Sequence, residues 1–182
     1  YALDLEHLLL RPLQWLLQAP TLTAALRPQF EVLVQRLHSR ILALGPLTQV
    51  LGHGDAHGQN NFVVNGPHGE RQAVFFDFDD AGFGYLAYEL AVYPWCIHPH
   101  TADGVMSDKA QARWQHFLAA YRELGAVSEA DLAAIPLFMA VRHIWLLGEY
   151  AGRVPVWGTQ AMPTDYLRRQ VDMLTQWENL TL

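Results

Sequence analysis

The first stretch of the chain repeats apolar residues at the spacing of an α-helix. Between residues 3 and 17, leucines fall on one helical face, at Leu5, Leu8, Leu9, Leu13 and Leu16. Pro20 ends this pattern, because proline lacks the N–H that a helix interior needs. A second helix is expected over residues 23–44, before Gly45 and Pro46. Both helices should face a core.

The middle of the chain changes to a β pattern. Residues 62–64 and 73–76 are rich in Val and Phe, and the turn-forming residues 65–70 separate them. Two such runs around a turn predict a β-hairpin. The hairpin would bring the polar clusters at its two ends, residues 53–60 and 77–80, side by side.

Helical spacing returns after Gly84. Ser128 and Asp131 form a variant capping box, with Asp in place of Glu, which opens a helix that Pro136 is expected to bend. The helices expected in this half cover residues 86–95, 107–124, 128–152 and 163–180. The chain is therefore predicted to be one α+β domain over residues 1–182, mostly α-helical, with a central β-hairpin that carries the polar residues.

Composition and charge narrow the class of protein. The chain has 182 residues, a formal net charge of −6, 51% hydrophobic and 16% charged residues, which is typical of a globular domain rather than a disordered, collagenous or coiled-coil chain. The acidic balance argues against a nucleic-acid partner, since phosphate neutralisation needs clustered cations.

Two further observations concern location. The lone Cys96 cannot form an internal disulfide, which favours a cytoplasmic protein. The apolar run over residues 135–148 contains Arg142 and His143 and is too short to span a bilayer, so no membrane association is expected.

The polar cluster before the hairpin contains an Asp and an Asn at the spacing of a phosphotransfer loop. Asp55 and Asn60 lie five positions apart, as in the H-R-D-x-x-x-x-N loop of kinases, where Asp receives the substrate hydroxyl proton and Asn holds Mg²⁺. Asp77 follows the second hairpin strand, as does the Asp of the kinase D-F-G segment. The spacing alone is a weak signal, but with the hairpin it favours a kinase lobe.

Phosphoryl transfer depends on positioning and charge neutralisation, which explains these residue types. Asn60 offers a neutral carbonyl oxygen and Asp77 a carboxylate, both hard ligands for Mg²⁺. Asp55 would orient and deprotonate the acceptor hydroxyl. His57 is a candidate donor to the moving phosphoryl group. Asp79 and Asp80 are candidates either to extend the metal site or to cap the next turn at Gly82.

Three motifs resemble the aminoglycoside phosphotransferase and choline kinase superfamily. They are His53-Gly54-Asp55-x-His57-x-x-Asn60, Phe76-Asp77-Phe78-Asp79-Asp80-Ala81-Gly82-Phe83-Gly84 and Tyr88-Glu89-Leu90-Ala91. The Asp pair and the tryptophan-rich tail are most similar to homoserine-kinase-like and stress-response-kinase-A-like members. Glu89 stands where many members carry Asp, and we interpret that position as structural.

The resemblance implies a fold and a reaction. The fold is the C-terminal lobe of a protein-kinase-like fold, and the reaction is transfer of the γ-phosphoryl group of ATP, with Mg²⁺, to a hydroxyl. Asp55 would be the catalytic base, and Asn60 and Asp77 would bind the metal and nucleotide. The acceptor would be a small molecule such as an aminoglycoside, an amino alcohol or homoserine; the acidic charge is compatible with a cationic acceptor but does not select one.

The other half of a kinase site is not visible in the sequence. No G-x-G-x-x-G cover and no strand-rich segment precede His53, and Lys109, the only lysine, follows both motifs. We therefore expect ATP to bind between this chain and an N-terminal lobe of the same protein, and the chain alone to be inactive. Tyr1 in place of Met suggests a truncated kinase, with a natural single lobe as the alternative.

Other classes share parts of the pattern. Asp77 and Asp79 also resemble the nucleophile and acid of haloacid-dehalogenase-like phosphatases, in which the first Asp follows a buried strand. His53, Asp55 and His57 could instead form a metal cluster of a hydrolase. A non-catalytic binding lobe is the third alternative.

Some polar residues have a structural interpretation beside the functional one. His53 is expected to order the loop backbone, whereas His57 stays open between a phosphate contact and a framework role. Arg142 and His143, on an apolar helix, are expected to satisfy buried carboxylates such as Glu89 rather than to bind substrate.

Overall fold

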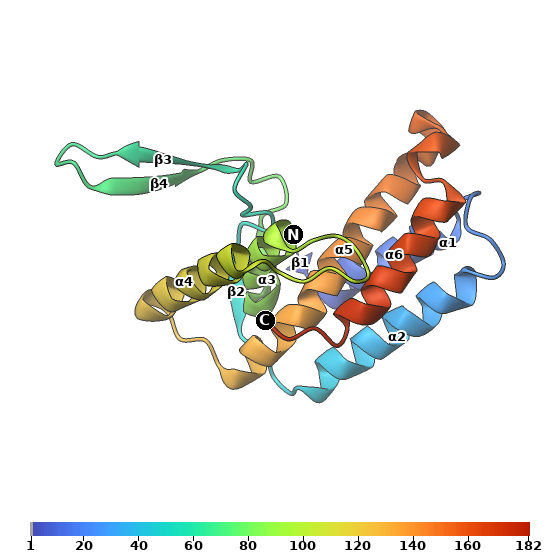
Figure 1. Ribbon diagram of the computed structural model, residues 1–182, viewed down its shortest axis with the longest axis horizontal. Helices are drawn as coiled ribbons and strands as arrows, with labels where there is room; N and C mark the ends of the chain where they lie inside the picture. Colours follow the sequence, from blue (N-terminus) through green and yellow to red (C-terminus); the bar gives the residue numbers. More distant parts are fainter. Residues whose placement is uncertain (1) are drawn as a thin grey trace.

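The longest helix, α5 (Glu129–Trp157), lies at the centre of the helical body (Figure 1). The structure is a computed structural model and describes residues 2–182. Helices α1 (Arg11–Leu17) and α3 (Leu86–Ile97) pack most extensively on α5. The core between them contains Leu16, Leu90 and Phe138, which are almost fully buried. The fold is α+β and mostly helical, as predicted.

The remaining elements largely follow the predicted secondary structure, with some exceptions. They are β1 (Ala2–Leu3), the π-helix η1 (Glu6–Leu10), α2 (Arg27–Ala43), β2 (Gln49–Gly52), β3 (Asn61–Asn65), β4 (Arg71–Phe75), β5 (Gly82–Tyr85), α4 (Asp108–Leu124), the 3-10 helix η2 (Thr159–Ala161) and α6 (Thr164–Trp177). The helix expected over residues 3–17 is confirmed over residues 5–17, with the π-helix η1 as its first part, but its expected start was wrong, because Leu3 belongs to a strand. The prediction that α5 ends near residue 152 was also wrong.

Two glycines, Gly148 and Gly152, lie inside α5 and not at its end. A Cβ on Gly148 would lie 2.5 Å from Pro12 Cα, and one on Gly152 would lie 3.9 Å from Trp15. Gly148 therefore allows α1 to approach α5 closely, whereas a Cβ at Gly152 would make only an ordinary van der Waals contact, and neither glycine marks the end of the helix. The helix ends at Gly158, whose φ of +83° suits glycine and whose N–H donates to Val154 O at 2.8 Å.

A small three-stranded sheet that the sequence did not indicate supports the polar loop. Strand β5 lies between β1 and β2, parallel to the first and antiparallel to the second. Gly84 permits this approach, because a Cβ there would lie 2.5 Å from Leu3 Cβ. Gly52 pairs with Gly82 at the end of the ladder. The segments after residue 52 and before residue 82 therefore leave the sheet at the same end.

The predicted hairpin is confirmed and projects away from the helical body (Figure 1). Strands β3 and β4 pair antiparallel, from Asn61 opposite Phe75 to Asn65 opposite Arg71. The side chains of both strands are largely exposed. Its exposed large apolar side chains, with those of the adjoining turn, are Phe62, Val63, Val64, Val74, Phe75, Phe76 and Phe78. A single hairpin with no buried face is marginally stable by itself, so this surface is suited to contact another body.

One buried carboxylate fixes the start of β2 to α5. Asp131 is fully buried and accepts hydrogen bonds from Thr48 N at 2.9 Å and Thr48 Oγ1 at 2.7 Å. It also completes the predicted capping box with Ser128. Burial raises the pKa of Asp131, but the hydrogen bonds from Ser128 and Thr48 outweigh it, so the net pKa is lowered. The strand that leads into the polar loop is thereby tied to the core helix.

Helix α5 is also, among residues 2–182, the one helix long and apolar enough to cross a membrane by length and composition. It has 29 residues, twice the apolar run seen in the sequence. However, 72% of its most apolar window is buried inside the fold. Core packing therefore accounts for its apolar character.

Candidate active site

The loop between β2 and β3 is joined to the turn after β4 by His53 and Asn60. His53 Nε2 lies 2.9 Å from Phe76 O, and the His53 ring packs on Phe78 with centroids 4.4 Å apart. Phe76 N donates to Asn60 O at 3.1 Å. The two polar clusters therefore lie side by side, as the hairpin predicted, and His53 orders the backbone.

At Gly54 the loop between β2 and β3 lies too close to Asp80 to leave room for a side chain. The φ of Gly54 is +79°, and its N–H donates to Glu89 Oε2 of α3 at 2.9 Å. A Cβ at this position would lie 2.2 Å from Asp80 O. The structural interpretation of Glu89 therefore agrees with its contact, since this carboxylate holds the loop against α3.

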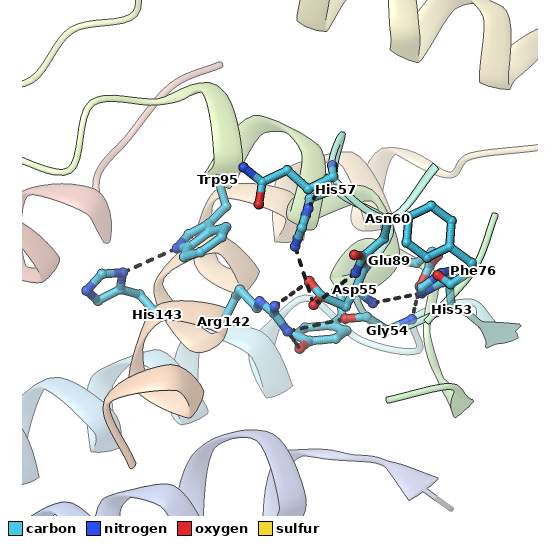
Figure 2. A network of polar contacts seen from close by, with 12 residues as sticks. His53, Gly54, Asp55, His57, Asn60, Phe76, Glu89, Trp95, Arg142 and His143 are labelled. Carbon is cyan, nitrogen blue, oxygen red and sulfur yellow. Dashed lines mark hydrogen bonds and ion pairs between the residues drawn. The ribbon is translucent and has the colours of Figure 1, made fainter. Parts of the chain in front are cut away.

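The carboxylate of Asp55 has three polar neighbours (Figure 2). Its Oδ1 pairs with Arg142 Nη2 at 2.5 Å. Its Oδ2 lies 3.4 Å from Asn60 Nδ2 and 3.6 Å from His57 Nε2. The side chain is 18% exposed, so it is held by the fold yet still reaches solvent.

Arg142 satisfies a carboxylate, as expected, but the carboxylate is not that of Glu89. The guanidinium instead pairs with Asp55 and donates to Gly54 O at 3.3 Å and Tyr88 Oη at 3.1 Å. Burial lowers the pKa of Arg142, but the oxygens of Tyr88 and Asp55 outweigh it and raise the net pKa. Burial also raises the pKa of Tyr88 to about 12. Sequence reasoning missed this pairing because 87 positions separate the two partners.

Asn60 and Asp77 are suited to hold a hard cation. Asn60 Nδ2 donates to Asp55 O at 3.0 Å, which turns the amide so that the carbonyl Oδ1 is the end available to a metal. Asp77 has a φ of 64° and is the only non-glycine residue with positive φ among residues 2–182. Such backbone strain is concentrated at functional sites. An amide oxygen and a carboxylate are therefore the types of donor that a hard divalent cation takes.

Asp80 contributes to the negative charge around this site. Burial raises the pKa of Asp80, and the charges of Asp55 and Asp77 raise it further, while Arg142 opposes them. Asp79, which the sequence also proposed as a metal ligand, is exposed, as is Asp77. A cation near Asp77 would relieve the repulsion among Asp55, Asp77 and Asp80.

Two alternative enzyme classes lose support from the geometry. The phosphatase interpretation needs a buried strand before Asp77, whereas every residue of β4 is exposed. A closed metal cluster of the hydrolase type needs three or more His, Cys, Asp or Glu side chains together, and residues 2–182 contain no such group. His53 Nε2 is engaged with Phe76 O instead.

His143 was expected to satisfy a carboxylate, but it contacts an amide and an indole. Its Nε2 donates to Gln170 Oε1 of α6 at 2.7 Å, and its Nδ1 accepts from Trp95 Nε1 of α3 at 3.3 Å. Burial lowers its pKa to about 4, and His100 and Arg142 lower it as well. His143 is therefore a neutral structural link between three helices.

This pKa predicts a pH dependence of stability. The folded pKa lies below the ordinary 6.5, so the unfolded state binds the proton first and stability is lost as pH falls from about 6.5 to 4. A shift of this size corresponds to about 3 kcal/mol. Urea unfolding of the 182-residue chain at pH 7 and pH 4.5 should show a smaller acid loss in His143→Gln than in wild type. Equal acid losses would contradict the assignment.

The helical body, the hairpin and the Asp55 loop form the C-terminal lobe of a protein-kinase-like fold. The chain belongs to the phosphotransferase enzyme family (APH), whose family model matches residues 2–127. It is 38% identical over 178 residues to an uncharacterized protein of Deinococcus radiodurans, a match that covers 97% of this chain and 50% of that protein.

Two solved structures share the fold. A microcompartment-associated aminopropanol kinase has a TM-score of 0.61 at 22% identity, covering 97% of this chain and 51% of its own. Amicoumacin kinase hAmiN, in complex with AMP-PNP, Ca²⁺ and Ami, has a TM-score of 0.58 at 21% identity, covering 91% and 52%. This chain thus spans about half the length of the proteins it matches.

Proposed function

We propose that this chain is the C-terminal lobe of an ATP- and Mg²⁺-dependent kinase that phosphorylates the hydroxyl of a small molecule. The proposal rests on one observation: Asp55, Asn60 and the turn that contains Asp77 lie together at one end of the three-stranded sheet. A base and two oxygen ligands are the parts that phosphoryl transfer requires from this half of a kinase.

Asp55 acts as the base in this proposal. The acceptor O–H bond breaks and its proton passes to Asp55 Oδ2, while the acceptor oxygen bonds to the γ-phosphorus. The bond between that phosphorus and the bridging oxygen breaks, and ADP leaves with the electron pair. In this proposal His57 Nε2, which lies 3.6 Å from Asp55 Oδ2, would donate to the transferring phosphoryl group.

Asn60 and Asp77 would hold the metal, through the amide Oδ1 and the carboxylate. When bound, Mg²⁺ would neutralise charge on the phosphates. Support for a nucleotide and a divalent cation comes from the amicoumacin kinase complex, which contains AMP-PNP and Ca²⁺.

The apolar surface of the hairpin supports the proposal that a second lobe packs against this chain. Phe62 and Val63 are each 62% exposed, and Leu51 on β2 is 80% exposed. Apolar side chains gathered on one projecting element are typical of an interface. In this proposal an N-terminal lobe of the same protein covers them and completes the ATP site, so the tests of activity below use the full-length protein.

The acceptor is proposed to be a small alcohol, and the solved relatives named for kinases of aminopropanol and amicoumacin support that class. ADP release from Mg-ATP should be measured with an amino alcohol (1-amino-2-propanol), an aminoglycoside (kanamycin) and homoserine as acceptors. At least one should raise ADP release more than tenfold over the rate without acceptor. Failure of all three to exceed twofold, with Mg-ATP binding intact, would favour the non-catalytic lobe.

A further inference from the structure

We propose that Arg142 is the positioning residue for the base: it holds Asp55 Oδ1 and leaves Oδ2 directed to the acceptor hydroxyl. The inference rests on the proposed function. Arg142 lies on α5, beyond the residues 2–127 that the family model matches, and no sequence motif led to it. The contacts around the guanidinium carry the argument.

The two oxygens of Asp55 are held unequally. Oδ1 pairs with Arg142 Nη2 at 2.5 Å, whereas Oδ2 has only longer contacts, at 3.4 Å to Asn60 Nδ2 and 3.6 Å to His57 Nε2. An oxygen that already accepts a charge-assisted hydrogen bond is the weaker proton acceptor. The less constrained Oδ2 is therefore the oxygen that takes the acceptor proton.

Arg142 itself is fixed from several directions. Its side chain is 4% exposed and lies over the rings of Trp145, at 4.6 Å, and Trp95, at 5.4 Å. Its Nη1 donates to Gly54 O and Tyr88 Oη. A planar guanidinium held on aromatic faces has little freedom. Asp55 is consequently attached to a rigid point of the core helix rather than to a mobile surface side chain.

Trp95, one of the two rings under Arg142, is itself held by hydrogen bonds. Its indole Nε1 donates to His143 Nδ1, and His143 Nε2 donates to Gln170 Oε1 of α6 (Figure 2 shows Trp95, His143 and Arg142). Helices α3, α5 and α6 therefore fix the ring on which Arg142 lies. Holding a catalytic group to within a fraction of an ångström is the means by which remote packing affects rate.

The test compares Arg142→Met and Arg142→Lys with a matched control, Arg153→Met. Arg153 lies on the same helix and stacks on Trp157 at 5.2 Å, but its side chain is 56% exposed and its ion-pair partner is Glu149. With the best acceptor of the panel above, Arg142→Met should lower kcat by about 10²-fold and leave KM for ATP within twofold. Arg142→Lys should retain part of the rate, since it keeps the charge, and Arg153→Met should match wild type.

A double variant separates positioning from a general structural role. If Arg142 acts through Asp55, Arg142→Met should cause no further loss of kcat in an Asp55→Asn background. Losses that multiply in the double variant, or an Arg142→Met kcat within threefold of wild type, would overturn the inference. Where Arg142→Met fails to fold, Arg142→Lys and its combination with Asp55→Asn decide the question in the same way.

The inference can fail independently of the proposed function. If the wild-type protein transfers no phosphoryl group, the proposed function fails, and unfolding of the 182-residue chain then tests the pairing. Arg142→Lys, Asp55→Asn and the double variant should show coupling of at least about tenfold in the unfolding constant, as contacting charges do. Coupling below twofold would show that Arg142 does not hold Asp55.

Discussion

Asp55→Asn is expected to lower ATP-dependent phosphoryl transfer by about 10²–10⁴-fold, the contribution of a general base. Asn preserves the size of the side chain but offers no carboxylate oxygen to take the hydroxyl proton. The change also leaves the buried Arg142 without its carboxylate partner, so a lower melting temperature is expected as well. The measurement is kcat for ADP release in the full-length protein, at a temperature below the transition of the variant.

The matched control is Asp172→Asn, which makes the same change at an exposed position of α6. Its rate and melting temperature should equal those of wild type. Asp77→Asn should also abolish transfer if Asp77 holds the metal. Near-wild-type rates in both Asp55→Asn and Asp77→Asn would refute the proposed site. Phosphatase activity that survives Asp55→Asn but not Asp77→Asn would instead favour the dehalogenase-like alternative.

Gly54→Ala is the second change with a large expected effect. The left-handed φ of +79° penalises any side chain, and the new Cβ would meet Asp80 O at 2.2 Å. Strain of about 1–2 kcal/mol and overpacking of about 1–3 kcal/mol act together. The loop must then move from Glu89, which accepts from Gly54 N. We expect a lower free energy of unfolding by roughly 2–5 kcal/mol and at least about 10²-fold slower transfer.

Gly125→Ala is the control for this substitution. Gly125 ends α4 at a φ of −145°, and the nearest atom to a Cβ there is Tyr121 Cε1 at an ordinary 3.5 Å. Its stability and rate should stay close to those of wild type. Chemical denaturation and the ADP-release assay on both variants provide the comparison. A Gly54→Ala variant as stable and active as Gly125→Ala would show that the loop is not confined as described.

The helices and the hairpin were predictable because their signals are local. Ser128 and Asp131 cap α5 through residues only three positions apart, and the β-rich runs around residues 65–70 pair directly with each other. The three-stranded sheet was not predictable. Its strands have two to four residues, too few for a periodic pattern, and β1 meets β5 only after the chain has passed through more than half of the fold's elements.

Part of the candidate site was predictable from the sequence, and part was not. Asp55, His57 and Asn60 lie within six positions, so a turn of the loop is enough to gather them. Asp77 follows from the pairing of β3 with β4. The role of Arg142 does not follow from spacing. Arg142 gave one signal, a charge within an apolar run, and that signal could not name Asp55 as its partner.

The sequence by itself determined the family, the helical frame and the identity of the base and metal candidates. Helical period, capping and turn preference act over a few residues. The residues of a motif can likewise be read directly from the sequence, in their order along the chain. Tertiary structure alone decided which oxygen of Asp55 is held, that Asp80 lies close enough to interact with Asp55 and Asp77, and that Gly54 has no room for a side chain. Those outcomes depend on distances between segments far apart along the chain, and packing of the helices on α5 sets these distances.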